Sequence, residues 1–289
     1  MVPPRRGRQG PTGRPSLPPM GIAHHQNTTP ATGHDPDPPA ERDPLQAVIF
    51  DVDGTLADTE RDGHRVAFNA AFEAAGLDYR WSVPEYGELL TTTGGRRRID
   101  RYLQSRGHLP TEAAALAAEL HRDKTRRFAA LVRTGAIEAR AGAAGLISAL
   151  RAEGVATAVA TTGTSDWVLP LLDILFGLDA FDIVVTGSDV TRLKPDPAVY
   201  VETLNRLSMT PADAVAVEDS ANGVHAAVAA GLRCVAVVNE YTRDQDFSGA
   251  VAVIDDLARP AGVSVLKGDP RLRAGLSVAA LRRLVTGVA

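Results

Sequence analysis

The chain has 289 residues, of which 44% are hydrophobic and 23% charged, and its formal net charge is -4. These values are typical of a globular protein with one large or two modest domains, and they argue against a general binder of nucleic acid or of an anionic membrane. The single cysteine, Cys234, excludes an internal disulfide framework, and no apolar run approaches the about 20 residues that span a bilayer.

Residues 1–43 differ in composition from the rest of the chain. They are rich in Pro, Gly and Arg and hold almost no aliphatic clusters, so we expect a disordered extension. The arginines, with no acid before Asp35, would also suit a transit peptide, but the many prolines disfavour an amphipathic targeting helix. We therefore favour a disordered extension, or a translation start at Met20, and expect a cytoplasmic protein.

From Leu45 onward, strands and helices are predicted to alternate. Residues 45–50 read as a buried strand, 59–75 as a helix that ends at Gly76, and 77–133 as mostly helical. Further strands are expected at 155–160, 183–186, 214–217, 234–238 and 251–254, and further helices at 143–153, 167–176, 198–207 and 221–230. A helix at 276–284 would either pack on the core or form an oligomer contact, and the pattern does not choose between these.

This alternation predicts an α/β fold with a Rossmann-like parallel sheet whose two faces are covered by helices. In such sheets, ligands bind beyond the carboxyl ends of the strands. We assign residues 44–59 and 140–260 to this core. Residues 60–139 are then an inserted helical cap, and residues 261–289 a C-terminal extension.

The sequence Asp51-Val-Asp53-Gly54-Thr55 follows the first predicted strand directly. A carboxylate at Asp51 can attack phosphorus and form an aspartyl phosphate. Asp53, one residue further on, can protonate the leaving oxygen and then deprotonate the attacking water. Gly54 allows a tight turn whose amide groups can face a phosphate. Asp and Gly also make ordinary turns, but the preceding buried strand favours the functional interpretation.

Three later segments would complete a phosphoryl-transfer site, and each also has a structural interpretation. Thr161 can donate to a phosphoryl oxygen, or cap a helix. Lys194, before Pro-Asp-Pro, can neutralise charge on Asp51 and on the phosphoryl group, or be a solvated surface lysine. Glu218 and Asp219 follow a buried strand, where acids are costly unless they bind something; Asp219 or Ser220 could also cap the next helix.

These acids predict a Mg²⁺ site, because Mg²⁺ prefers oxygen ligands. Asp51, Asp219 and the main-chain carbonyl of Asp53 would provide the protein's share of the ligands. Glu218 would hold a metal-bound water.

The order of these four motifs resembles the haloacid dehalogenase superfamily over about residues 45–257. A dehalogenase proper lacks the second aspartate, so Asp53 indicates phosphoryl transfer. The cap segment Thr91-Thr-Thr-Gly94-Gly-Arg96-Arg-Arg98 and the segment 58–69 are similar to the CbbY-like and β-phosphoglucomutase-like branch. This resemblance implies a phosphatase that takes a sugar bisphosphate, xylulose 1,5-bisphosphate in CbbY.

The resemblance also implies which residues contact the substrate. In addition, the paired donors of an arginine match the geometry of a second phosphate. A solvated basic helix face is the alternative for the arginines, and a core-packed histidine is the alternative for His64. The substrate-binding residues that we expect are Glu60, His64, Gly94, Gly95, Arg96, Arg98 and Thr162. The chain departs from the branch at Arg96 and Arg97, in place of Lys and Glu, at Gly163, and at Arg140-Ala-Gly142 in place of a Pro-Gly.

The sequence therefore predicts a Mg²⁺-dependent phosphatase, a phosphoric monoester hydrolase that acts as a monomer on a small sugar phosphate and binds neither nucleic acid nor membrane. A β-phosphoglucomutase-like sugar phosphomutase is the alternative within enzymes, because it shares the cap and the motifs. A non-catalytic phosphate-binding module is the alternative outside enzymes, and the complete set of catalytic groups argues against it.

Overall fold

The fold is taken from a computed structural model, which describes residues 43, 45–92, 94–259 and 261–286. The disorder predicted for residues 1–43 thus lies outside the described residues, except at Asp43. That residue accepts a hydrogen bond from the Leu45 amide and forms a 2.6 Å ion pair with Arg282. The start of the described chain is thereby joined to its C-terminal helix.

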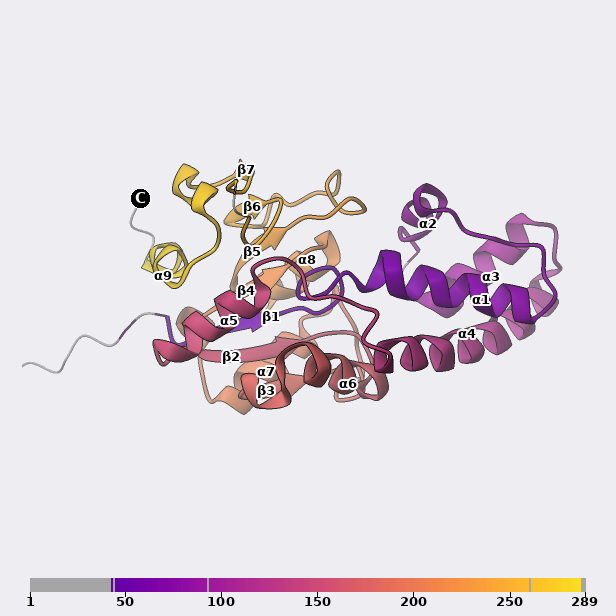
Figure 1. Cartoon of the computed structure of the whole chain (residues 1–289), viewed down its shortest axis with the longest axis horizontal. Helices are drawn as coiled ribbons and strands as arrows, with labels where there is room; N and C mark the ends of the chain where they lie inside the picture. Colours follow the sequence, from indigo (N-terminus) through magenta and orange to yellow (C-terminus); the bar gives the residue numbers. More distant parts are fainter. Residues whose placement is uncertain (1–42, 44, 93, 260, 287–289) are drawn as a thin grey trace, which may run out of the picture. The chain divides into compact units, whose positions relative to one another are not determined.

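Seven strands of the described chain form one sheet in the order β3-β2-β1-β4-β5-β6-β7 (Figure 1). The first six in this order are parallel, which confirms the predicted Rossmann-like core, and β7 is antiparallel to β6 at the edge. The strands are β1 (Ala47–Phe50), β2 (Ala156–Ala160), β3 (Ile183–Val185), β4 (Ala214–Glu218), β5 (Arg233–Val237), β6 (Ala252–Ile254) and β7 (Val265–Lys267).

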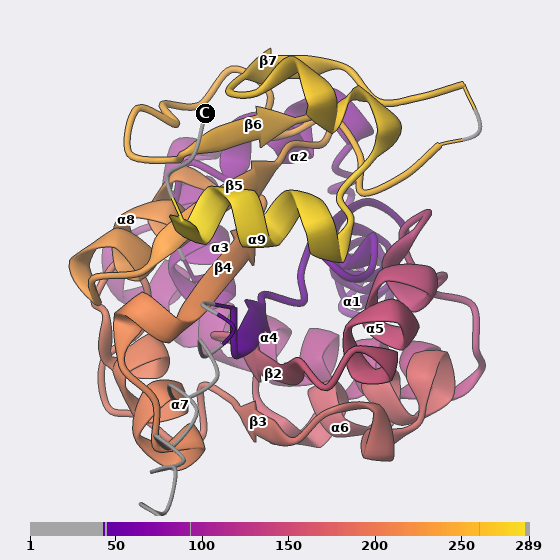
Figure 2. The same ribbon diagram turned by 90° about the vertical axis from the view of Figure 1, so that its left-hand side faces the viewer.

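Successive residues of a strand point to opposite faces of the sheet, and the two faces carry different apolar clusters. In β1, Val48 and Phe50 belong to one apolar cluster, and Ala47 and Ile49 to another. The face of Val48 is covered by α5 (Ala143–Ala152), α6 (Ser165–Phe176) and α9 (Val278–Thr286), and the face of Ala47 by α7 (Ala198–Leu207) and α8 (Ala221–Ala229). Figure 2 shows α7 and α8 on one side of the strands and α5 and α6 on the other.

The segment between β1 and α5 is largely helical. It contains η1 (Glu60–His64), α1 (Arg65–Ala74), α2 (Val83–Leu89), α3 (Gly95–Ser105) and α4 (Pro110–Arg133). The predicted helix at 59–75 therefore exists, but its first turn is a π-helix. Within that turn Gly63 packs so closely on Phe128 that an added Cβ would lie 2.6 Å from its ring.

These helices have an apolar cluster of their own, in which Phe68, Phe72, Trp81 and Tyr86 pack together. Helix α4 is longer than the others, with 24 residues, and its final turns belong to the core cluster instead. There, Phe128 packs against Trp167 of α6, with ring centroids 5.0 Å apart.

The chain enters and leaves this helical segment side by side. Ala57 and Ala139 form an antiparallel bridge, and the Arg140 amide donates to the Leu56 carbonyl at 2.8 Å. The two linkers are thus hydrogen-bonded to each other next to the turn that follows β1.

The C-terminal residues complete the core, and the helix predicted at 276–284 packs on it as α9. Leu281 of α9 is fully buried in the same cluster as Val48. The remaining short helices are η2 (Leu178–Ala180), η3 (Pro211–Asp213) and η4 (Pro270–Ala274).

Candidate active site

The predicted strand-end residues meet at the carboxyl edge of the sheet. Asp51 follows β1, Glu218 is the last residue of β4, and Asp219 comes next. Lys194, from the loop between β3 and α7, places its Nζ 2.6 Å from Asp51 Oδ1, 2.6 Å from Glu218 Oε1 and 2.8 Å from the Ala160 carbonyl. The lysine is thus a buried ion-pair partner and not the solvated surface residue of the alternative interpretation.

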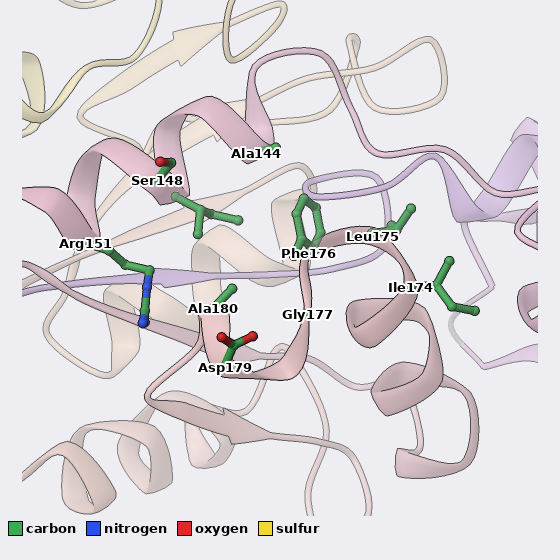
Figure 3. A pocket seen from close by; sticks show the side chains of 10 residues that line it. Ala144, Ser148, Arg151, Ile174, Leu175, Phe176, Gly177, Asp179 and Ala180 are labelled. Atoms are coloured by element: carbon green, nitrogen blue, oxygen red, sulfur yellow. The ribbon is translucent and has the colours of Figure 1, made fainter.

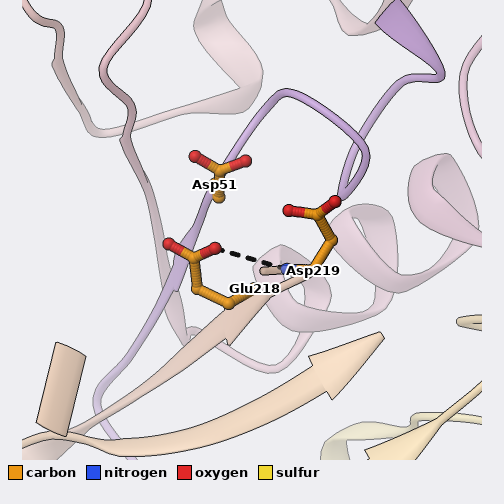
Figure 4. Close-up of side chains that lie close together, drawn as sticks. All are labelled: Asp51, Glu218 and Asp219. Carbon is orange, nitrogen blue, oxygen red and sulfur yellow. Dashed lines mark hydrogen bonds between the residues drawn. The ribbon is translucent and has the colours of Figure 1, made fainter. Parts of the chain in front are cut away.

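Asp51, Glu218 and Asp219 form a compact group of buried acids (Figure 4). Each offers a carboxylate oxygen, and these oxygens all lie within 4.8 Å of one another. Three acids and one lysine leave the group with a negative charge, which an apolar interior tolerates poorly unless a cation offsets it.

Glu218 is held from three directions. Lys194 and the Tyr200 hydroxyl both donate to its Oε1, and the Asp219 amide donates to Oε2 at 3.3 Å. Gly223, in the first turn of α8, makes room for the carboxylate, because an added Cβ would lie 1.9 Å from Glu218 Oε2. Because Glu218 is fully buried and accepts several hydrogen bonds, it suits the predicted role of holding a metal-bound water better than a role in direct substrate contact.

The turn after β1 approaches Asp219 closely at Gly54. This glycine has φ +82°, and an added Cβ would lie 2.2 Å from Asp219 Oδ2. Asn239, after β5, donates to the same oxygen at 2.7 Å. A residue with a side chain could therefore occupy position 54 only if Asp219 moved, which explains the glycine in the motif.

Asp53 lies across the turn from the acid group and points toward the helical segment. Its Oδ1 accepts from the Thr59 hydroxyl and lies 3.4 Å from His64 Nε2. His64 Nδ1 in turn lies 2.8 Å from Lys124 Nζ on α4. Since an ammonium can only donate, Nδ1 accepts from Lys124 and the His64 proton is on Nε2, facing Asp53.

The electrostatics of the two aspartates of the motif differ. Burial raises the pKa of Asp51 and of Asp219, and the neighbouring acids raise it further. Burial also opposes ionisation of Asp53, but the hydrogen bonds from His64 and Thr59 prevail and lower its pKa. The two carboxyls of one motif therefore differ in how readily they ionise.

The acid group fits a hard divalent cation. All of its donor atoms are oxygens, and the three acids face a single lysine, Lys194, which cannot balance their charge. A bound cation would restore that balance. The residues present thus suit a divalent metal.

A cavity of about 520 Å³ opens above the acids, between the sheet edge and the helical segment. Thr161 and Glu218 are not part of its lining; both are fully buried. The Thr161 hydroxyl accepts from the Gly163 amide at 3.0 Å. The predicted site residues that line the cavity are Asp51, Asp53, Glu60, His64, Gly94, Gly95, Arg96, Arg98, Thr162, Lys194 and Asp219.

On the helical side, Glu60 and Arg98 are linked through Tyr86. The Tyr86 hydroxyl donates to Glu60 Oε2 and accepts from Arg98 Nη1 at 3.1 Å, while Arg98 Nε donates to the Leu89 carbonyl. The Arg98 guanidinium also lies over the Tyr86 ring, 5.2 Å from its centroid. Arg98 is therefore fixed by packing, not mobile on a solvated helix face.

Sequence reasoning missed several residues of this cavity. Lys124 and His121 are one turn apart on α4, and burial lowers their pKa values to about 8 and about 4. Tyr241, from the loop after β5, lines the cavity and packs against Gly87 of α2. A histidine and a lysine in a charged helix give no sequence signal that would have identified the α4 pair.

A second hollow, of about 390 Å³, lies between α5 and the end of α6 (Figure 3). Arg151 and Asp179 are its charged lining residues, and the acid group is not part of its lining. It therefore offers none of the chemistry found at the sheet edge.

Comparison with known proteins shows the family of this chain. Residues 45–231 match a family described as haloacid dehalogenase-like hydrolase. The chain is 45% identical to protein CbbY of Cereibacter sphaeroides over 226 residues, which cover 77% of this chain and 96% of CbbY.

Solved structures are similar as well. A CbbY variant from Rhodobacter sphaeroides in complex with xylulose 1,5-bisphosphate is 43% identical, with a TM-score of 0.64 over 73% of this chain and 94% of that one. A putative β-phosphoglucomutase from Thermotoga maritima is 27% identical, with a TM-score of 0.58 over 72% and 94%.

The chain belongs to the haloacid dehalogenase-like hydrolases and is a phosphoric monoester hydrolase. The predicted resemblance to the CbbY-like branch is thereby confirmed. In the part of the chain that the structure describes, no helix is both long and apolar enough to cross a bilayer.

Proposed function

We propose that this protein is a Mg²⁺-dependent phosphatase that cleaves a ketose bisphosphate, such as xylulose 1,5-bisphosphate, through a phosphoaspartyl intermediate. The observation that carries the proposal is the contact of Lys194 with Asp51 within a buried acid group, at the base of a cavity with a cationic wall. The similarity to CbbY, one structure of which holds xylulose 1,5-bisphosphate, supports the choice of substrate.

Asp51, Asp219 and the main-chain carbonyl of Asp53 would hold the Mg²⁺, with Glu218 supporting a water ligand. When bound, the ion would offset the charge of the acids and of the phosphoryl oxygens. The carbonyl assignment agrees with the Asp53 side chain, which is turned toward Thr59 and His64.

The reaction would take place in two steps. An oxygen of Asp51 attacks phosphorus, the bond to the sugar oxygen breaks, and Asp53 donates a proton to that oxygen. Asp53 then takes a proton from water while the water attacks the same phosphorus. The bond between phosphorus and Asp51 breaks, which releases phosphate and restores the Asp51 carboxylate. Lys194 would stabilise the charge on Asp51 and on the phosphoryl oxygens throughout.

The distal phosphate would bind at the helical wall of the cavity. Arg96, Arg97 and His121 line this wall near Gly95, whose Cα lies so close to His121 that an added Cβ would be 3.0 Å from the imidazole. An arginine pair provides the planar donors that a phosphate accepts. We therefore expect bisphosphates to be preferred over monophosphates.

A phosphate-release assay over sugar mono- and bisphosphates with Mg²⁺ tests the proposal. We expect the highest kcat/KM for ketose bisphosphates and no release by Asp51→Asn. Preference for monophosphates would contradict the substrate assignment, and turnover by Asp51→Asn equal to that of the wild type would contradict the nucleophile.

The mutase alternative is favoured by the similarity to the putative β-phosphoglucomutase. Incubation with glucose 1-phosphate and a sugar bisphosphate activator separates the two reactions. Isomerisation to glucose 6-phosphate without net phosphate release would establish the mutase and exclude the phosphatase.

A further inference from the structure

Arg140 lies at the return from the helical segment and binds main-chain carbonyls of three different segments. Its Nη1 donates to the Gly54 carbonyl at 2.6 Å and to the Val237 carbonyl at 3.0 Å. Its Nη2 donates to the carbonyls of Val238 at 3.2 Å and Asp255 at 3.1 Å. Only 11% of the side chain is exposed, so these contacts are largely shielded from water.

The contact with Gly54 falls within the catalytic motif. The Gly54 amide donates to the Ala57 carbonyl at 2.8 Å, which fixes the peptide plane that carries the Asp53 carbonyl. Arg140 holds the next peptide plane through the Gly54 carbonyl. Two successive planes are thus fixed, and with them the direction of the Asp53 carbonyl.

The main chain around Arg140 supports the same turn. Its amide donates to Leu56, and its neighbour Ala139 forms the bridge with Ala57. The guanidinium then ties this pair of linkers to the ends of β5 and β6. A hydrogen-bonded arginine fork can satisfy several carbonyls at once, whereas the single ammonium of a lysine cannot reproduce its geometry.

We propose that Arg140 is a positioning residue, which fixes the turn at Gly54 and thereby the metal-binding carbonyl and the acid–base carboxyl of Asp53. The proposal rests on the function proposed above. A loosened turn would leave substrate contacts with the helical wall in place but misalign the reacting groups. Replacement of Arg140 should therefore lower kcat and weaken Mg²⁺ binding while leaving KM nearly unchanged.

Arg259 offers a matched control. It pairs with Asp256 at 2.8 Å and with the Asp255 carboxylate at 3.2 Å, so it binds the same two acidic residues that Arg140 approaches. Its guanidinium binds these carboxylates, whereas that of Arg140 binds the turn. An effect that comes only from weakened packing around Asp255 and Asp256 should appear in both variants.

The experiment compares full-length Arg140→Gln, Arg140→Lys and Arg259→Gln with the wild type. One readout is kcat and KM for xylulose 1,5-bisphosphate. The other is the Mg²⁺ concentration that gives half of the maximal thermal stabilisation without substrate, which depends on no activity. Arg140→Lys keeps the charge and serves as the folded variant if Arg140→Gln unfolds.

We expect both Arg140 variants to lose about tenfold or more in kcat, to change KM by less than about threefold, and to need about fivefold more Mg²⁺. Arg259→Gln should change each value by less than about twofold. The proposal would be overturned if Arg140→Lys had the same kcat and the same Mg²⁺ midpoint as the wild type. It would also be overturned if Arg259→Gln lost as much as the Arg140 variants. If the wild type released no phosphate, the proposed function would fail, and the Mg²⁺ midpoint would still test the role of Arg140.

Discussion

Lys194 Nζ lies 2.6 Å from Asp51 Oδ1, although 143 residues separate the two in the chain. The contact arises because β1 and the loop after β3 both open at the carboxyl edge of a parallel sheet. Burial opposes the lysine charge, but Asp51 and Glu218 outweigh it and raise the pKa of Lys194, so the ammonium stays charged. The pair therefore supplies a fixed positive charge next to the proposed nucleophile.

The first prediction concerns this charge. Lys194→Met should destabilise the protein by about 3 kcal/mol or more, because two buried carboxylates lose their cation. It should also abolish phosphate release. Urea unfolding and the phosphate-release assay measure the two effects, with Lys267→Met as the control, since Lys267 is an exposed edge-strand residue. Stability equal to that of the wild type would show that the ion pair does not operate in solution.

Asp53→Asn tests the acid–base role. The variant retains the main chain, so Mg²⁺ should still stabilise it against heat, whereas kcat should fall by about 10²- to 10⁴-fold. Steady-state kinetics measures the loss of kcat, and thermal unfolding with and without Mg²⁺ measures metal binding. Asp62→Asn, at an exposed position of the same segment, is the control and should keep its activity. Undiminished kcat in Asp53→Asn would reject the assignment.

A third prediction follows from the space around Glu218. Gly223→Ala should destabilise by roughly 1–3 kcal/mol and lower activity, because the new methyl group would displace the carboxylate. Gly145→Ala is the matched control: it lies within α5, and its added Cβ would meet nothing within 4 Å. That change should stabilise by up to about 1 kcal/mol. Urea unfolding of both variants decides, and a stabilising effect of Gly223→Ala would contradict the prediction.

The pH dependence of stability should report on Lys124. Burial lowers its pKa from 10.5 to about 8, so between these values the unfolded chain binds more protons than the folded one. The unfolding free energy of the wild type should therefore gain with rising pH in this window, and that gain should be absent in Lys124→Met.

The same reasoning predicts that Lys124→Met is more stable than the wild type at pH 7, by about 1–3 kcal/mol, and that its advantage shrinks toward pH 10. Its activity should fall, because His64 loses the partner that orients it toward Asp53. Urea unfolding at several pH values measures this. A constant difference between the two proteins across the window would contradict the prediction.

The central group of the site could be predicted from the sequence because each member directly follows an apolar strand or lies in a loop at the same sheet edge. The alternation of Ala and Val within β4 likewise indicates a strand covered on both faces. Gly54 and Gly223 make their close approaches inside these motifs, where a glycine is itself a signal.

Other residues could not be predicted because their roles depend on packing between distant segments. Lys124 resembles any lysine of a charged helix until α4 is placed against His64. Arg140 gains its role only when β5, β6 and the turn at Gly54 come together. Strand β7 is short and half exposed, so it lacks the apolar run that identifies the buried strands.

The most direct test of the account is chemical trapping of the intermediate. Enzyme mixed with substrate and Mg²⁺ is quenched with acid during the first turnover and treated with borohydride, which reduces an acyl phosphate to an alcohol. Mass spectrometry then locates the modified residue. We predict homoserine at position 51 in the wild type, and no homoserine in Asp51→Asn. Release of phosphate in a single turnover with Asp51 unmodified, or with another residue reduced, would contradict the account.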